Sequence, residues 1–138
     1  MLAYVSIYRN RVTSSYVIQP LGKDPDGFII DNGAPEILSE AEFDSRILNA
    51  IEKAIEKFKP ESKESDGKEW RDKDYDEFLR THDHVTVMRT EKGFYEVVPS
   101  KRMKGGYRSQ EDSRVVVKPQ RLSVDLLPVV RAAFGKCQ

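Results

Sequence analysis

Cysteine is almost absent from this chain, since Cys137 is the only one. No intrachain disulfide can form, so we expect a protein of the reducing cytoplasm. No apolar run approaches the roughly 20 residues that a membrane-spanning helix needs, so we expect no membrane partner. The opening residues, MLAYVSIYRNRV, lack the apolar stretch and small-residue cleavage site of a signal peptide and are typical of a strand.

Residues that carry metal or acid–base chemistry are also scarce. The two histidines, His82 and His84, flank Asp83. An H-x-H pair on a strand could begin a metal site, but zinc needs three or four ligands and no third one stands out. We therefore expect these residues to form a helix-to-strand turn, with no metal and no cofactor.

The sequence contains no spacing typical of a catalytic constellation, whether Ser-His-Asp, Cys-His or paired carboxylates. Cys137 is next to the last residue, where a nucleophile would have no fixed partner. The sequence therefore favours a binding protein over an enzyme. A small enzyme, whose catalytic residues lie too far apart in the sequence to be recognised, is a third hypothesis after binding of a protein partner and binding of nucleic acid or a nucleotide phosphate.

Charge is neutral in sum but unevenly distributed. Residues 36–77 contain 14 acidic and eight basic side chains, whereas residues 78–138 contain six acidic and 12 basic ones. If the two segments stay apart in the fold, the protein has an acidic side and a basic side that can orient a charged partner. If folding interleaves the segments, the asymmetry disappears.

Alternating apolar and β-branched residues predict strands in both halves of the chain. Pro20 should end the second strand, because it has no N–H for a central ladder. The predicted strands are 3–8 and 13–19 in a first hairpin, 84–90 and 94–99 in a second, and the shorter runs 28–30 and 114–118. The last of these is apolar throughout its middle, so we expect it to be central in the sheet.

The strongest helix prediction covers residues 39–58. Ser39 and Glu42 have the spacing of a capping box, in which each side chain bonds the other's backbone N–H. Apolar residues then recur at three- and four-residue steps and form one stripe: Phe43, Ile47, Ala50, Ile51, Ala54, Ile55 and Phe58. We also predict a short helix over 74–80 and a last helix that begins near Leu122, with Ser123 as its N-cap.

Two polar stretches are predicted to be loops: residues 61–73, which should be flexible, and residues 100–113. Strands joined by hairpins indicate a single α+β domain over residues 1–138. Its mainly antiparallel sheet should be built from two hairpins plus short strands, packed by two main helices.

The acidic segment is the first candidate for a partner-binding surface. Its carboxylates could face a basic protein while an aromatic residue acts as an anchor, or they could simply be solvated. The candidate residues are Asp66, Glu69, Trp70, Asp72, Asp74, Tyr75 and Asp76.

A basic, glycine-containing segment is the alternative candidate. Adjacent glycines let a backbone approach an anion, cations neutralise it, and an aromatic ring can stack on a base. The segment does not match the phosphate-binding loop pattern, so it could bind nucleic acid, a nucleotide phosphate or an acidic partner, or be a solvated loop. The candidates are Lys101, Arg102, Lys104, Tyr107 and Arg108.

The first hairpin, YVSIYRNRVTSSYVIQP, the amphipathic helix and the stretch HVTVMRTEKGFYEVVPSKRMKGGYR resemble the immunity proteins of contact-dependent growth inhibition systems in Gram-negative bacteria. The resemblance implies a cytoplasmic, non-enzymatic protein that binds one cognate toxin domain, commonly a nuclease, and covers its active site. In such systems the immunity gene lies directly downstream of the toxin gene. The resemblance assigns no interface residues and implies no direct contact with nucleic acid.

Overall fold

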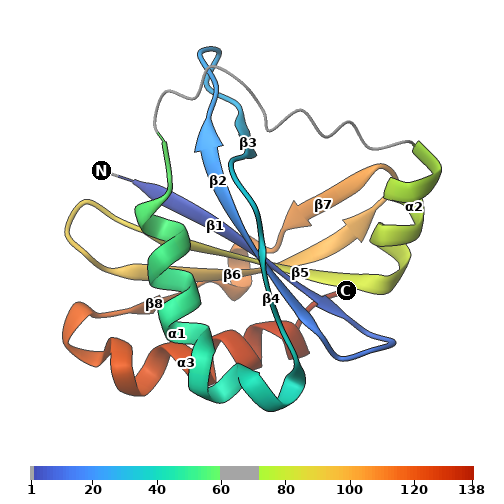
Figure 1. The fold of residues 1–138 in the computed structure, drawn as a ribbon. Helices are drawn as coiled ribbons and strands as arrows, with labels where there is room; N and C mark the ends of the chain where they lie inside the picture. The colour runs from blue at the N-terminus through green and yellow to red at the C-terminus, as the bar shows by residue number, and fades with distance from the viewer. Residues whose placement is uncertain (1, 60–71) are drawn as a thin grey trace.

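The protein forms one antiparallel sheet of eight strands in the order β3-β2-β1-β5-β6-β7, with β4 paired to β2 and β8 paired to β6 (Figure 1). This computed structural model describes residues 2–59 and 72–138. The strands are β1 (Ala3–Asn10), β2 (Tyr16–Lys23), β3 (Ile29–Asp31), β4 (Glu36–Leu38), β5 (His82–Arg89), β6 (Tyr95–Met103), β7 (Gly106–Ser109) and β8 (Val115–Val117). The helices are α1 (Glu40–Glu56), α2 (Asp72–Thr81), α3 (Leu122–Gly135) and the short 3-10 helices η1 (Glu111–Ser113) and η2 (Pro119–Arg121). The predicted α+β class with an antiparallel sheet is confirmed.

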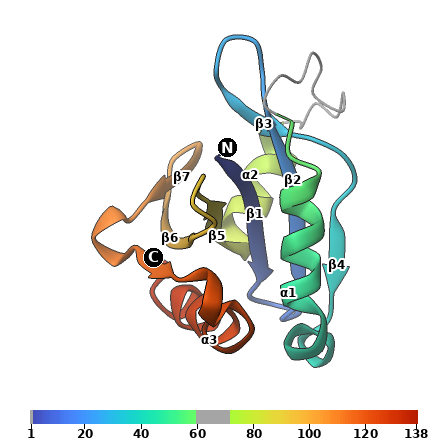
Figure 2. The ribbon, with the colours of Figure 1, turned by 90° about the vertical axis from the view of Figure 1, so that its left-hand side faces the viewer.

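Alternation along the central strands divides the sheet into two faces. Val5 and Ile7 of β1 and Val85 and Val87 of β5 are fully buried on the face that α1 and α3 cover. The intervening side chains of these strands belong to the opposite face, which carries more polar and aromatic groups. Figure 2 shows the sheet curling between α1 and α3.

Helix α1 begins as the sequence predicts. The backbone N–H of Glu42 donates to the Ser39 hydroxyl at 3.2 Å, and the Ser39 N–H donates to the Glu42 carboxylate at 3.0 Å. The apolar stripe is buried against the sheet along its whole length, from Phe43 to Phe58. Both the capping box and the packing face are therefore confirmed.

Pro20 does not end the second strand, which continues to Lys23. Pro20 pairs with Val5 of β1, and on its other side β2 changes partner from β4 to β3 near this position. No ladder there requires the N–H that proline lacks. The short strand that follows comprises Ile29–Asp31, whereas Phe28 is exposed.

The predicted polar loop over 100–113 is wrong. Strand β6 extends to Met103 and pairs with β7 from Ser100↔Ser109 to Met103↔Gly106, so the segment is a third hairpin. Gly105 takes a positive φ of 82° at its tip, a conformation that glycine adopts at no steric cost.

Two smaller predictions in the last third of the chain also fail. Among the described residues, strand β8 pairs only with β6, and Val116 is 55% exposed, so β8 is an edge strand and not a central one. Helix α3 begins at Leu122 with Arg121 at the cap position, which places Ser123 inside the helix.

The opposite charges interleave where α1 meets α3. Arg131 of α3 donates to Asp44 at 2.9 Å and to Glu40 at 3.1 Å, which lowers the pKa of the Glu40 carboxyl. None of the described helices has the length and apolar character to cross a membrane.

Candidate functional site

Helix α2, which carries the described part of the acidic candidate segment, and the β6–β7 hairpin lie at the same end of the molecule, opposite the β5–β6 turn (Figure 1). Helix α2 and the β6–β7 hairpin meet there: a Cβ placed on Gly106 would lie 3.8 Å from the Tyr75 hydroxyl oxygen. Sequence separation of about 30 residues hides this proximity. We call this region the α2 end.

Packed rings from four elements, α2, β1, β5 and β7, form the base of the α2 end. Phe78 of α2 stacks on the His82 ring with centroids 3.8 Å apart, and Tyr8 of β1 meets Phe78 edge-on at 4.9 Å. Tyr107 of β7 lies 4.8 Å from His84 and 5.9 Å from Tyr8. These contacts fix α2 and the hairpin on the polar face of the sheet.

His84 lies inside this cluster as a neutral imidazole. Its Nδ1 lies 2.7 Å from the Ser100 hydroxyl and its Nε2 lies 3.0 Å from the Ser6 hydroxyl. A neutral ring has one donor and one acceptor nitrogen, so one serine accepts and the other donates. Burial lowers the pKa of His84 to about 4 from an ordinary 6.5.

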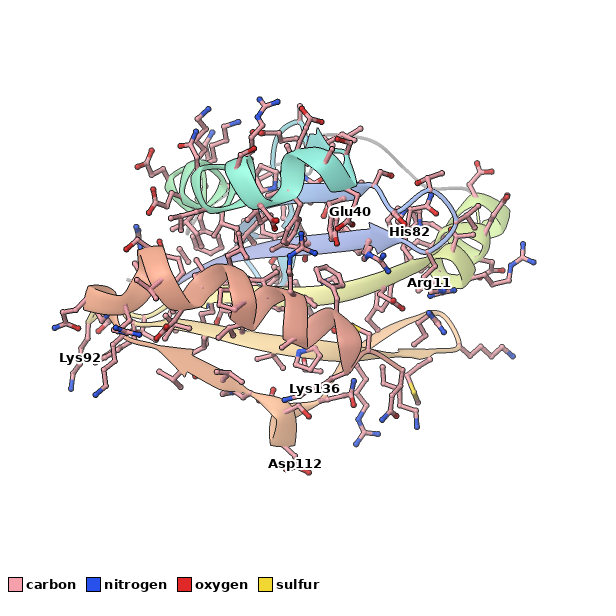
Figure 3. All side chains as sticks on the ribbon, turned by 90° about the horizontal axis from the view of Figure 1, so that it is seen from below. Arg11, Glu40, His82, Lys92, Asp112 and Lys136 are labelled. Atoms are coloured by element: carbon pink, nitrogen blue, oxygen red, sulfur yellow. The ribbon has the colours of Figure 1, made fainter. Side chains whose placement is uncertain are left out.

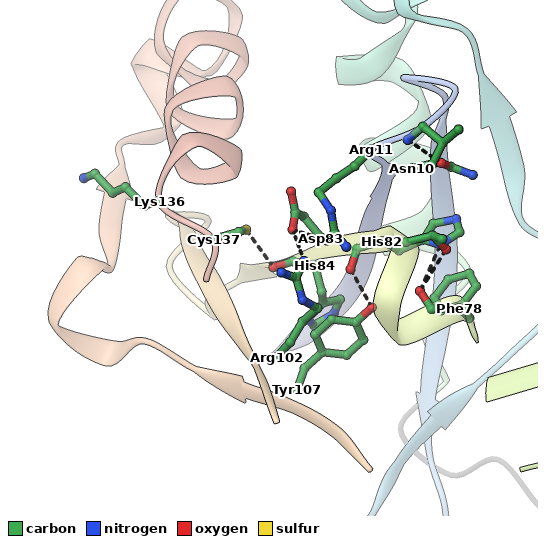
Figure 4. Close-up of polar contacts among 12 residues, drawn as sticks. Asn10, Arg11, Phe78, His82, Asp83, His84, Arg102, Tyr107, Lys136 and Cys137 are labelled. Atoms are coloured by element: carbon green, nitrogen blue, oxygen red, sulfur yellow. Dashed lines mark hydrogen bonds and ion pairs between the residues drawn. The ribbon is translucent and has the colours of Figure 1, made fainter. Parts of the chain in front are cut away.

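A second polar group, Asp83, ties the start of β5 to two other segments. The guanidinium groups of Arg11 and Arg102 donate to the same Asp83 oxygen, at 2.9 and 2.8 Å (Figure 4). The Tyr107 hydroxyl donates to the His82 carbonyl at 2.9 Å, and burial raises the pKa of that hydroxyl. The three residues His82 to His84 belong to β5, directly after α2 ends at Thr81.

No metal site is present among the described residues, where no group of three or more His, Cys, Asp or Glu side chains converges. Both nitrogens of His84 have serine partners, and Nδ1 of His82 lies 3.0 Å from the Phe78 carbonyl oxygen. The thiol of Cys137 donates to the His84 carbonyl at 3.4 Å, and burial raises its pKa, which disfavours the reactive thiolate.

The acidic candidates divide into described and undescribed positions. Asp74 and Asp76 are exposed on α2, while Tyr75 is half-buried against the hairpin and burial raises the pKa of its hydroxyl. Asp72 begins α2, although its side chain lies outside the described structure. The positions of Asp66, Glu69 and Trp70, and the predicted flexible loop up to residue 71, lie outside the described residues; residues 72 and 73 belong to α2.

The basic candidates point in two directions. Arg102 pairs with Asp83, and Tyr107 packs on the aromatic base, so these two side chains face inward. Lys101, Lys104 and Arg108 are exposed. The structure therefore brings three of the five residues together on the outer surface.

Sequence reasoning missed Ser6, Tyr8 and Ser100, which hold His84 and the aromatic base. Ser6 and Ser100 are 6% and 2% exposed, but nothing in their local sequence distinguishes them from surface serines. The only available signal is their alternation, since Ser6 and Tyr8 share one face of a predicted strand.

No protein-family model matches the sequence of this chain, and no curated protein matches it. Its fold is similar to that of a protein of unknown function, NMB0488, from Neisseria meningitidis, at 10% identity, with a TM-score of 0.74 over 100% of this chain and 96% of that one. It is also similar to a chain of the CdiA-CT/CdiI toxin and immunity complex from Yersinia pseudotuberculosis, at 11% identity, with a TM-score of 0.72 over 100% of this chain and 98% of that one. At these identities the likeness shows a shared fold.

Proposed function

We propose that this chain is an immunity protein of a contact-dependent growth inhibition system. It binds one cognate toxin domain, a nuclease, and neutralises it by covering the active site; the chain performs no catalysis itself. The observation that carries the proposal is the fold likeness to a chain of a toxin and immunity complex, which spans the whole of this protein. The resemblance of its hairpin and helix segments to the same class of proteins supports it independently of the fold.

The outer side of α2 is suited to a cationic cleft of the kind that a nuclease presents to its substrate. Asp74, Asp76 and Glu77 are exposed, whereas Phe78 and Leu79 of the same helix pack inward. A nuclease binds phosphates through Lys and Arg, so a carboxylate surface can occupy the same groups. We therefore place the toxin-facing surface on α2, continuing from Asp72 into the preceding acidic residues.

Because α2 is held in place in the free protein, its acidic surface should bind a partner at a small cost in conformational entropy. The stacking of Phe78 on His82 and the contact of Phe78 with Tyr8 hold α2 in place before any partner arrives. A surface that is already ordered loses less conformational entropy on binding than one that must first fold. Association can then be fast and governed by charge.

The test uses the toxin domain encoded directly upstream of this protein's gene. We expect its expression to arrest growth, co-expression of this chain to restore growth, and the two purified proteins to form a complex. An immunity protein from an unrelated toxin pair, expressed to the same level, is the control and should neither restore growth nor bind. Absence of both rescue and complex would reject the proposal.

A further inference from the structure

The β6–β7 hairpin has two faces of different character, and its inner face is immobilised. Arg102 and Tyr107 are directly paired across the two strands. Arg102 donates to Asp83 at 2.8 Å, and the Tyr107 hydroxyl donates to the His82 carbonyl at 2.9 Å (Figure 4). The side chains before and after this pair must therefore point outward, because neighbouring residues of a strand alternate.

The outer face places like charges opposite each other. Lys101 pairs with Arg108 across the hairpin, and Lys104 follows at its tip. Within residues 2–59 and 72–138, none of these three cations forms an ion pair, and all three are exposed. Like charges directly opposite on two strands are destabilising by a few tenths of a kcal/mol, so folding alone does not explain this arrangement.

A shallow cleft lies beside these cations. It has a volume of about 450 Å³, and its lining includes Lys101, Arg108, Ser109 and Gln110. Two carboxylates, Glu111 and Asp112, also line it, and Glu111 is engaged by the Arg114 guanidinium. The cleft thus offers two unpaired cations together with hydroxyl and amide groups, which are the usual partners of a carboxylate.

We propose that the outer face of this hairpin, formed by Lys101 and Arg108 with Lys104 at its tip, is a docking site for an acidic segment of the partner protein. This inference rests on the proposed function and adds a second contact to it. The partner would then meet α2 with a basic surface and the hairpin with an acidic one. Two adjacent contacts of opposite sign fix the orientation of a complex as well as its affinity.

The neighbouring charges favour an acidic protein segment over nucleic acid. Asp74, Asp76 and Glu77 of α2 are exposed at the same end of the molecule as the hairpin. A long polyanion following the hairpin would be repelled by these carboxylates, whereas a short acidic segment can stop within the cationic face. The net charge of zero provides no general attraction for nucleic acid either.

The decisive variants are Lys101→Glu and the double variant Lys101→Glu/Arg108→Glu. The single variant places an acid opposite Arg108, which should leave the melting temperature unchanged or slightly higher. Lys92→Glu and Lys92→Glu/Lys118→Glu are matched controls. Lys92 and Lys118 are exposed, and Lys92 lies at the opposite end of the sheet (Figure 3). The residues next to them are close in space, since a Cβ placed on Gly93 would lie 3.6 Å from the Pro119 side chain.

We expect Lys101→Glu to weaken binding of the cognate toxin domain about 10-fold, and the double variant to weaken it further, with both control variants within about twofold of the unmodified protein. Kinetic binding measurements at two salt concentrations, with melting curves for every variant, provide the readout. Unchanged affinity in both hairpin variants, with the toxin domain still bound by the unmodified protein, would overturn this inference and leave the proposed function standing.

Two further outcomes also decide the matter. If the unmodified protein does not bind the toxin domain, the proposed function and this inference both fail. A labelled single-stranded DNA and an RNA of the same length are measured in parallel at physiological salt. Saturable binding of either one that the hairpin variants abolish would identify nucleic acid as the occupant and reject the acidic protein segment.

Discussion

His84 illustrates how one polar side chain can be accommodated within an aromatic cluster. Its two nitrogens are satisfied by Ser6 and Ser100, and its ring contacts Tyr8 and Tyr107. A protonated ring would have to donate from both nitrogens and carry its charge away from water, which is why burial lowers its pKa to about 4. The folded state therefore holds this histidine neutral over the whole physiological range.

A stability cost at mildly acidic pH follows from this pKa. Between about pH 6.5 and pH 4 the unfolded chain binds a proton at His84 that the folded chain does not, so stability falls as pH falls. From pH 7 to pH 5 we expect the His84 contribution to amount to a loss of about 2 kcal/mol. Urea unfolding at several pH values would measure it.

The variant His84→Gln isolates this contribution. Glutamine can still donate and accept but does not titrate, so its stability should vary less with pH by about the same 2 kcal/mol. His82, whose pKa burial also lowers, titrates in both proteins and cancels in the comparison. Identical pH dependence in the two proteins would show that His84 is protonated freely in the folded state.

Helices and strands are predicted best from the sequence where apolar residues recur with one period. The α1 stripe and its capping box were sufficient to predict that helix, because every residue from Phe43 to Ile55 that faces the sheet is apolar. The β6–β7 hairpin was missed for the opposite reason. Its inward residues are Arg102 and Tyr107, held by an ion pair and a hydrogen bond, so no apolar alternation marks the strand.

The α2 end could be predicted only in part. Charge along the chain identified both candidate segments, but their contact at Tyr75 and Gly106 depends on the strand order β1-β5-β6-β7. Strand order is set by packing between distant parts of the chain, which local propensity does not encode. The prediction that Pro20 ends the second strand failed for the same reason. A proline is tolerated there because β2 changes partner from β4 to β3, which only the strand order reveals.

The residues after α3 make hydrogen bonds to β6 and to the residue that follows β7. The Gln138 N–H donates to the Ser100 carbonyl at 3.2 Å, and the Arg102 N–H donates to the Gln138 carbonyl at 2.7 Å. The Gln110 side chain also donates to the Lys136 carbonyl at 2.9 Å. Gln138 is thus held against β6 by two backbone hydrogen bonds, and Lys136 is tied to the residue that follows β7.

Deletion of residues 136–138 should therefore loosen the hairpin without unfolding the core. We expect the amide hydrogen of Arg102 to exchange about 5- to 10-fold faster, the loss of roughly one hydrogen bond, while amides in the middle of α1 keep their protection. Hydrogen exchange resolved to single residues is the measurement. Equal protection of Arg102 in both proteins would mean that the hairpin is held by β5 and the aromatic base alone.

The net charge of the whole molecule is zero, so its attraction for a charged partner depends on where the charges lie on its surface. Arg131 neutralises the α1 carboxylates Glu40 and Asp44, whereas Asp74 and Asp76 of α2 remain exposed. A neutral protein can still attract a charged partner if one such patch faces it. In the proposed complex we therefore expect the long-range attraction to come from α2.

The double variant Asp74→Lys/Asp76→Lys tests that placement. If α2 faces a cationic toxin cleft, association should slow about 10-fold at low salt, with a smaller difference at high salt because ions screen charges beyond about 8–10 Å. Glu52→Lys/Glu56→Lys is the matched control, since both residues are exposed on α1 and the net charge changes equally. Stopped-flow association at several ionic strengths would separate the two cases. Equal slowing in both variants would mean that only net charge matters, and no slowing in either would remove α2 from the interface and leave the β6–β7 hairpin as the remaining candidate.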